Sequence, residues 1–341
     1  MCGLPSASPS GFIQPLKINY LRMKKFKFDV LAIGELNVDL IMNNIEGTPE
    51  VGKEVLAGSM TLTLGSSTAI FAANLSSLGS KVGFLGKIGN DSFGDLVKES
   101  LSEKGIDTSL VIREDGLTTG ATVVLAVGED RANVTFPGAM DHLTINDISD
   151  ESLLQAKHIH FSSFFIQPGI RKNVQSLFKR AKELGLTTSL DTQWDPSEKW
   201  DFDYKSILPW VDVFLPNETE ILFLTGTKKT EDALKKLTPF GKNIIIKQGN
   251  KGALLRSEKG EMYEMPAYLN NKVVDTIGAG DSFNAGFVHM FVRGEPVQKC
   301  LDFGNLTGAI STTAAGGTGA FKSKELIRKA SKEKFNITIN I

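Results

Sequence analysis

The sequence predicts an α/β fold in which helices cover both faces of a mostly parallel sheet. Its 341 residues are enough for one large domain or two smaller ones. Strand-like and helix-like segments alternate along most of the chain, as they do in repeated β-α-β units. Two stretches break this alternation with consecutive strands, which indicates a small antiparallel flap on the main sheet.

The alternating segments are hydrophobic runs bounded by turn residues. The predicted strands are residues 28–34, 82–88, 158–162, 187–191, 211–215, 243–247 and 253–256. The predicted helices are residues 68–78, 91–103, 170–184, 280–292 and 297–313. Gly79 and Gly185 directly follow two of these helices, and Gly105 comes two residues after a third, where glycine commonly ends a helix. Ligands of such sheets bind in the crevice at the carboxyl ends of the strands.

The flap is predicted from strands around residues 45–64 and 118–137. Residues 119–136 alternate in hydrophobicity, turn at Gly128-Glu129-Asp130 and return. An ordinary hairpin on the edge of the main sheet is the alternative.

Residues 1–25 contain no apolar segment typical of a signal peptide, so we expect a loose extension before a domain of residues 26–336.

The composition excludes several classes of protein. With 38 Lys and Arg against 39 Asp and Glu, no basic stripe predicts a nucleic-acid partner or a membrane surface. No apolar run is long enough for a transmembrane helix. Cys2 and Cys300 are the only cysteines, and metal-ligand spacings such as C-x-x-C are absent. We therefore expect a cytoplasmic protein without a disulfide framework.

The most informative segment is Gly278-Ala279-Gly280-Asp281, which precedes an apolar, helix-like run. Three small residues let the backbone approach a ligand closely. The helix start directs free N–H groups and a positive dipole end at the same place, which suits an anion. A carboxylate beside a bound phosphate is understandable if Asp281 removes a proton from an attacking hydroxyl. The alternative is that Asp281 only caps the helix.

The longer run Asp275-Thr276-Ile277-Gly278-Ala279-Gly280-Asp281 resembles the Asp-Thr-x-Gly-Ala-Gly-Asp signature of the ribokinase-like (PfkB) family of carbohydrate kinases. The resemblance continues, by the order of its landmarks, over roughly residues 28–320. It implies a ribokinase-like three-layer α/β/α fold whose flap is a lid over the sugar and a contact in a homodimer. It also implies transfer of the γ-phosphoryl group of ATP, with Mg²⁺, to a small-molecule sugar or sugar acid. In this reading the N–H groups of residues 277–281 hold the developing charge, with Gly278, Ala279 and Gly280 as catalytic residues beside Asp281.

The resemblance places the acceptor near the end of the first strand. Asp39 is carried over as a substrate ligand and Asn37 as a weaker second candidate, with a turn cap as the alternative. Gly65 and Ser66, before the first predicted helix, are expected to contact the substrate, although Ser66 replaces a glycine of the family pattern. Ile70 replaces an asparagine that contacts the sugar. Because isoleucine forms no hydrogen bond, we expect the acceptor to present a methyl, methylene or deoxy carbon there.

The nucleotide site is likewise implied by the resemblance. Lys247 and Gly249 lie in a turn that relatives use near the nucleotide phosphates, where Gly278 and Gly280 also contribute. Asn305 is expected to line the adenine pocket.

The metal ligands are a further implication. Asn217 and Glu220 match an Asn-x-x-Glu motif and are expected to bind Mg²⁺ through water, with a capping box as the alternative. Many relatives bind K⁺ between the Asp275 segment and the glycine turn of residues 315–320, so Asp275 is a candidate K⁺ ligand.

A second landmark also departs from the family pattern. After Asp191 the family often has an asparagine and then a basic residue, but Gln193 and Asp195 stand here, and Asp195 is expected to cap a turn.

Three rival functions remain. A nucleoside kinase would share the scaffold. A non-catalytic sugar-binding regulator is disfavoured because Asp281 is retained. A dehydrogenase would need G-x-G-x-x-G after the first strand, which the chain lacks there.

Overall fold

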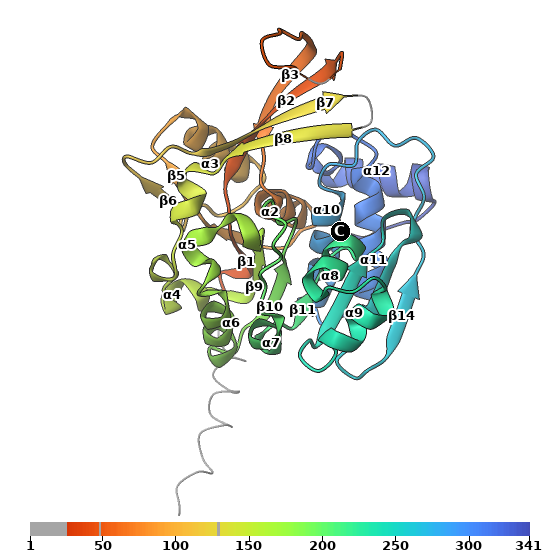
Figure 1. Cartoon of the computed structure of the whole chain (residues 1–341). Helices are drawn as coiled ribbons and strands as arrows, with labels where there is room; N and C mark the ends of the chain where they lie inside the picture. Colours follow the sequence, from red (N-terminus) through yellow and green to blue (C-terminus); the bar gives the residue numbers. More distant parts are fainter. Residues whose placement is uncertain (1–25, 48, 128–129) are drawn as a thin grey trace, which may run out of the picture.

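The structure, a computed structural model, describes residues 26–47, 49–127 and 130–341 (Figure 1). The predicted extension of residues 1–25 and two residues of the flap turn, Gly128 and Glu129, lie outside the described residues. The main sheet contains β1 (Phe28–Ile33), β4 (Val82–Leu85), β9 (Ala156–Ser162), β10 (Thr187–Asp191), β11 (Val213–Phe214), β12 (Asn243–Lys247), β13 (Ala253–Arg256) and β14 (Met262–Met265). Their order is β14-β13-β12-β11-β10-β9-β1-β4. The strands from β4 to β12 pair in parallel, and β13 and β14 run antiparallel at one edge.

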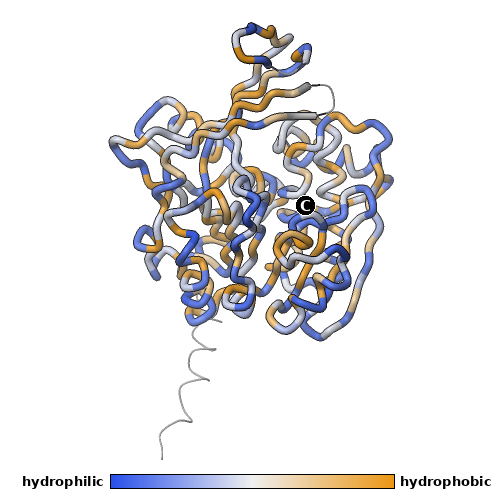
Figure 2. The backbone as a smooth tube through the Cα atoms, viewed as in Figure 1, coloured by the Kyte–Doolittle hydropathy of each residue, from blue (hydrophilic) through white to orange (hydrophobic). Residues whose placement is uncertain are grey.

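Helices cover both faces of this sheet, which confirms the predicted three layers. One face packs against α2 (Ser67–Ser77), α3 (Ser92–Glu103), α10 (Ala279–Phe291) and α11 (Val297–Ser311), with α12 (Lys324–Phe335) packed on α11. The other face packs against α4 (Asp150–Leu153), α5 (Pro168–Arg171), α6 (Val174–Glu183), α7 (Tyr204–Ile207), α8 (Glu218–Thr225) and α9 (Thr230–Leu237). Hydrophobic residues line the strands, and hydrophilic residues gather in the surrounding loops (Figure 2).

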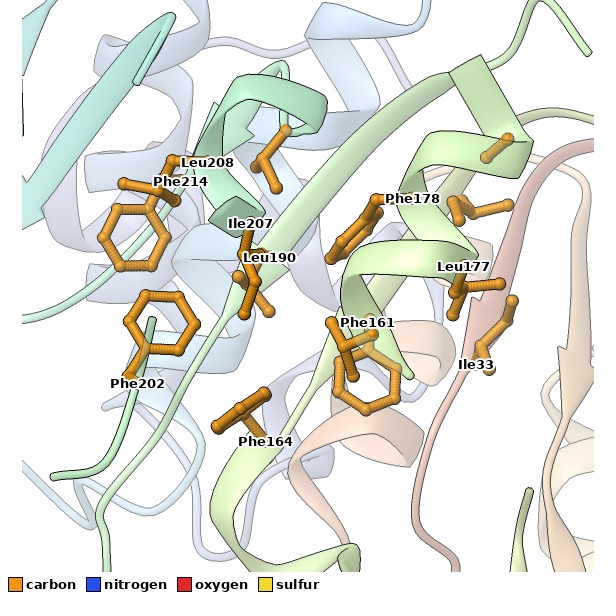
Figure 3. Packing of buried hydrophobic residues seen from close by; sticks show 14 of the residues in the cluster. Ile33, Phe161, Phe164, Leu177, Phe178, Leu190, Phe202, Ile207, Leu208 and Phe214 are labelled. Atoms are coloured by element: carbon orange, nitrogen blue, oxygen red, sulfur yellow. The ribbon is translucent and has the colours of Figure 1, made fainter. Parts of the chain in front are cut away.

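The two faces follow from the alternation of side chains along a strand. On β1, Leu31 and Ile33 belong to one buried cluster, whereas Val30 and Ala32 belong to the other. Figure 3 shows the first cluster, in which aromatic rings fill the space between the strands and α6 and α7. Burial on both faces explains why these strands are continuously apolar in sequence.

The flap is a four-stranded sheet, the lid sheet, with the order β3-β2-β7-β8. Its strands are β2 (Asn37–Ile45), β3 (Ala57–Leu64), β7 (Gly120–Val127) and β8 (Asp130–Phe136). The lid therefore begins at residue 37 and not near residue 45, because the chain leaves β1 and enters β2 after only three residues. Residues 51–56, which were predicted to be extended, form no strand.

Two further predictions of secondary structure were wrong. The strand predicted over residues 82–88 is broken at Gly86 into β4 and β5 (Lys87–Gly89), and β5 pairs with β6 (Ile112–Glu114) in a separate sheet. The helix predicted over residues 170–184 is interrupted at Asn173 between α5 and α6. The helices α8, α9 and α12 were not predicted at all. Within the described part of the chain, no helix is both long and apolar enough to cross a membrane.

Candidate active site

Five neighbouring strands of the main sheet bring polar side chains to their common carboxyl edge. The contributing residues are Glu35 after β1, Ser163 after β9, Asp191 at the end of β10, Asn217 after β11 and Lys247 at the end of β12. Four of them line a cavity of about 1120 Å³ that the lid sheet also borders, and Asp191 lies against Lys247. β1 is flanked by β4 and β9, so the cavity opens at the topological switch point of the sheet.

The start of α10 faces this cavity, as the glycine-rich motif predicted. Gly278 is the N-cap in a left-handed conformation with φ of 71°. A Cβ atom on Gly278 would lie 2.7 Å from the Cα of Gly317 and 3.0 Å from Ile70. Only glycine fits here, because both the backbone angle and the neighbouring turn exclude a side chain.

The N–H groups at the start of α10 divide into two kinds. Ala279 donates its N–H to the carbonyl oxygen of Thr276 over 3.2 Å. The N–H groups of Gly278, Gly280 and Asp281 have no acceptor within the described residues. Three donors, rather than all of residues 277–281, are therefore available to an anion at this helix start.

Asp275 joins the two glycine turns of the site. Its Oδ1 accepts the N–H of Ile277 over 2.9 Å, and its Oδ2 accepts the N–H of Gly316 over 2.8 Å. The N–H of Ile277 is therefore taken up by Asp275 and does not contribute to the anion site. The bonds hold the turn of residues 315–320 against the start of α10.

Asp281 is 93% buried (7% exposed) and lines the cavity. Its Oδ1 accepts a hydrogen bond from Nε2 of Gln193 over 3.0 Å, and the same nitrogen lies 3.0 Å from Oδ2 of Asp191. Gln193 adopts a φ of 58°, which is uncommon for a residue other than glycine. Burial and the neighbouring Asp191 raise the pKa of Asp281 to about 8. The carboxylate is therefore a stronger base than an ordinary aspartate.

Lys247 places a cation beside Asp281 and the anion site. Its Nζ lies 2.7 Å from Oδ2 of Asp191 and 3.6 Å from the position that a Cβ of Gly280 would occupy. Burial alone would lower the pKa of Lys247, but Asp191, Glu220 and Asp281 raise it above its ordinary value. The ammonium group is therefore retained next to the free N–H groups.

Asn217 and Glu220 form the capping box that was the alternative for this motif. The N–H of Asn217 donates to Oε2 of Glu220 over 2.8 Å, and the N–H of Glu220 donates to Oδ1 of Asn217 over 2.8 Å. Glu220 also lines the cavity, and burial together with Asp191 raises its pKa to about 7. Within the described residues, no group of three or more His, Cys, Asp and Glu side chains is arranged as a metal cage.

The predicted acceptor residues Asn37 and Asp39 line the cavity from the lid. Asn37 donates its Nδ2 to Oδ1 of Asp39 and to Oγ1 of Thr122, each over 3.0 Å, and so orients Asp39. A Cβ on Gly65 would lie 2.2 Å from Oδ1 of Asp39. Gly65 thus leaves the space that the Asp39 side chain occupies.

Ser66 and Glu35 connect the lid to the floor of the cavity. Ser66, with φ of 71°, caps α2 by accepting the N–H of Ala69 over 3.0 Å, and its Oγ lies 3.0 Å from Oε1 of Glu35. Glu35 also accepts hydrogen bonds from the N–H and hydroxyl of Thr68 and from the hydroxyl of Ser163. Burial raises the pKa of Glu35. The Ser66 hydroxyl is thus already engaged within the protein.

Some of the remaining predicted residues line the cavity and others do not. Gly249 lines the cavity, whereas Asn305 is not among its lining residues and donates Nδ2 to the carbonyl oxygens of Met265 and Pro266 over 3.0 and 3.2 Å. Ile70 lines the cavity and packs against the glycine turns. Asp195 caps its turn, as predicted, by accepting the N–H groups of Ser197 and Trp200.

Sequence reasoning did not identify all residues of this site. Glu35 was not singled out, and nothing local shows that Gln193, which follows the recognised Asp191, reaches Asp281. Asp141 and Trp194 also line the cavity, and no motif marks them.

Comparison with known proteins finds carbohydrate kinases both by sequence and by structure. The pfkB family carbohydrate kinase profile matches residues 27–324. An uncharacterized sugar kinase of Archaeoglobus fulgidus is 31% identical over 69% of this chain and 92% of its own length. A 5-dehydro-2-deoxygluconokinase of Lacticaseibacillus casei is 27% identical over 83% of this chain and 89% of its own. The crystal structure of a ribokinase from Thermotoga maritima superposes with a TM-score of 0.76 at 26% identity, covering 90% of this chain and all of that one.

Proposed function

The chain belongs to the PfkB family of carbohydrate kinases, and on that premise we propose that it phosphorylates a sugar hydroxyl beneath the lid with ATP. One observation carries this function. A buried carboxylate, Asp281, stands at a helix start between free N–H groups and a lid-covered pocket. A hydroxyl held by Asp39 can reach Asp281, while the transferred phosphoryl group is held by Gly278 and Gly280.

The phosphoryl end of the cavity supports in-line transfer. The free N–H groups and the Lys247 ammonium face the place where negative charge accumulates in the transition state. Asp281 accepts the proton of the attacking hydroxyl, and Gln193 holds its Oδ1 in place. The lid excludes water, which would otherwise compete as the acceptor.

The family resemblance supports a proposal for the residues that contact the nucleotide and the ions. We propose that Lys247 and Gly249 contact the nucleotide phosphates and that Asn305 meets the adenine through its Oδ1, since its Nδ2 is engaged. Asn217 and Glu220 would hold Mg²⁺ through water, and the ion would neutralise phosphate charge. A K⁺ ion would need the remaining lone pairs of Asp275, because both oxygens already accept N–H groups.

A nucleoside kinase is the second candidate, because large apolar side chains are among those that line the cavity. They are Met140, Phe165, Ile166 and Trp194. Such side chains could pack against a nucleobase attached to the sugar. A panel that compares nucleosides with free sugars separates the two functions.

The outer surface of the lid supports a homodimer. Strand pairing aligns one apolar face across all four strands, the apolar lid face, which consists of Leu40, Met42, Met60, Leu62, Val123, Leu125, Val134 and Phe136. Met60, Val134 and Phe136 are 63%, 64% and 55% exposed. A contiguous apolar face of this kind is typical of an interaction surface, and we propose that it meets the same face of a second copy.

Asp281→Asn tests the function directly. The substitution keeps the shape and removes the base, so we expect a folded protein that binds ATP with sugar-dependent ADP release lowered by about 10²- to 10⁴-fold. Asp201→Asn, at an exposed aspartate outside the cavity lining, is the matched control and should retain full activity. Near-normal ADP release from Asp281→Asn would refute the assignment.

A further inference from the structure

Helix α2 packs against α10 beside the two glycine turns of the candidate site (Figure 1). Ile70 of α2 packs against both turns. A Cβ atom on Gly278 would lie 3.0 Å from its Cγ2, and a Cβ atom on Gly317 would lie 2.5 Å from its Cδ1. Asn74 follows Ile70 by one helical turn, so the two side chains share a face of α2. A polar group at position 74 is therefore close to both glycine turns.

The amide group of Asn74 holds both sides of the close approach between Gly278 and Gly317. Its Nδ2 donates to the carbonyl oxygen of Gly317 and to Oγ of Ser282, each over 2.9 Å. The Ser282 hydroxyl in turn donates to the carbonyl oxygen of Gly278 over 2.7 Å. One side chain of α2 thus holds Gly317 directly and holds Gly278 through Ser282.

The partners of Asn74 require a donor with two hydrogens. The carbonyl oxygen of Gly317 can only accept, and the one hydrogen of the Ser282 hydroxyl is already donated to Gly278. The amide –NH₂ group has two hydrogens and meets both needs. An ionised aspartate of the same shape would offer acceptors alone.

Packing by itself does not account for an asparagine at this position. Asn74 is fully buried, and its Oδ1 accepts no hydrogen bond from the part of the chain that the structure describes. A buried acceptor without a partner costs free energy. An apolar side chain would avoid this cost, but it would lose both N–H bonds. What the amide adds is the link between the two turns.

We propose that Asn74 is a positioning residue for phosphoryl transfer, which it serves by fixing the turn of residues 315–320 against the first turn of α10. The three free N–H groups at the start of α10 then stay directed at the transferred group. Asp275 links the same two turns from a partly exposed place, and Asn74 links them from the interior. This inference rests on the proposed kinase function and adds a residue to it. Such donors act only when they are aligned, so a small displacement is costly.

Asn74→Ala provides the first test. The variant loses both donors, so we expect kcat to fall by about 10²-fold while KM for the acceptor stays within about twofold of the parent value. Asn243→Ala is the matched control. Asn243 is also buried and makes two side-chain hydrogen bonds with the backbone, but it begins β12 at the opposite edge of the sheet. It should keep the parent kcat at a temperature where thermal melts show all the proteins to be folded.

Nucleotide binding provides a second measurement that does not depend on turnover. Calorimetry with Mg²⁺ present compares ADP with β,γ-imido-ATP, which carries a γ-phosphoryl group. In Asn74→Ala we expect the Kd of the analogue to rise about tenfold and the Kd of ADP to stay within about twofold, because the γ-phosphoryl group is the one that meets the displaced N–H groups. A purely structural role would lower the melting temperature and leave both kcat and this ratio of Kd values unchanged.

Ser282→Ala provides a third test, which also decides the matter if Asn74→Ala does not fold. Alanine suits a helix, and the substitution removes only the connection to Gly278. We expect kcat to fall about tenfold, and the double variant should be no slower than Asn74→Ala, because the two residues act through one chain of hydrogen bonds.

The outcomes separate this inference from the kinase function. A folded Asn74→Ala with the parent kcat and the parent ratio of Kd values would overturn the inference. Equal losses in Asn74→Ala and Asn243→Ala, or an undiminished kcat in Ser282→Ala, would overturn it as well. If the parent protein released no ADP with any sugar or nucleoside, the kinase function would be refuted instead, and the ratio of Kd values would still decide the role of Asn74.

Discussion

At the scale of the residue, the properties of Asp281 come from partners that are distant in the chain. Gln193 lies 88 residues away and donates to its Oδ1. Asp191 lies nearby and, together with burial, raises the pKa of Asp281. Asp39 is oriented in a similar way. Asn37 donates to Asp39 and also to Thr122, which lies 85 residues from Asn37 in the chain. The residue types were recognised in the sequence, but their proton affinities depend on these contacts.

The raised pKa of Asp281 predicts the pH dependence of activity. As a base, Asp281 must be ionised, and kcat/KM reports the free enzyme. We therefore expect kcat/KM to fall as the pH is lowered through about 8, with the loss following one protonation. Steady-state assays at pH values on both sides of about 8 measure this change in kcat/KM. A profile that stays flat down to about pH 6 would contradict the role.

The same group predicts a pH dependence of stability. In the unfolded chain the carboxyl ionises near its ordinary pKa of 3.8, whereas the folded protein retains the proton until about pH 8. Between these values the folded state binds more protons, so the free energy of unfolding falls as the pH rises. Asp281→Asn should be more stable than the parent protein at pH 8, and the difference should shrink towards pH 4. Urea unfolding of both proteins at the two pH values measures this difference in the free energy of unfolding. A difference that is the same at both pH values would argue against the shifted pKa.

At the scale of the element, the start of α10 depends on a close approach between two glycine turns. The motif predicted the helix to within one residue at each end, because small residues before an apolar run are a strong local signal. It did not show that Gly317 fills the space beside Gly278. Other elements lacked a local signal, and the predicted helix over residues 170–184 broke at Asn173.

Gly278→Ala tests this close approach. The new Cβ would meet the Cα of Gly317 at 2.7 Å, so the turn must shift and the N–H donors move away from the phosphoryl group. We expect kcat to fall by at least about 10²-fold. Gly294→Ala is the matched control, since Gly294 also has a positive φ of 78° but no atom within 4 Å of the added Cβ. Both variants should lose about 1 kcal/mol of stability from backbone strain, but only Gly278→Ala should lose activity. Equal kcat values for the two variants, at a temperature where thermal melts show both to be folded, would contradict the role of the turn.

At the scale of the whole molecule, the lid sheet stands above the carboxyl edge of the main sheet (Figure 1). One face of the lid borders the cavity through Asp39, Thr122 and Thr135. The apolar lid face points away from the cavity because side chains alternate along each strand. The lid therefore borders the cavity with one face, and its apolar face is the surface through which we propose that two copies associate.

Val134→Lys tests the proposed homodimer. A charge on the apolar lid face should oppose burial of that face, so sedimentation should show a dimer for the parent protein and a monomer for the variant at micromolar concentration. Thr61→Lys places the same charge on the opposite face of β3 and should leave the dimer intact. A monomeric parent protein would contradict the proposal.

The sequence alone determined the layered α/β architecture, most of the parallel strands and the glycine-rich motif at the start of α10, because these depend on local hydrophobic patterning and on glycine-rich turns. The tertiary structure alone decided that Gln193 reaches Asp281, that Asp141 lines the cavity, and that Ser66 and Asp275 use their oxygens within the protein. It also set the boundaries of the lid and the breaks at Gly86 and Asn173. These features arise from contacts between residues that are far apart in the chain, and such contacts leave no periodic signal in the residues that make them.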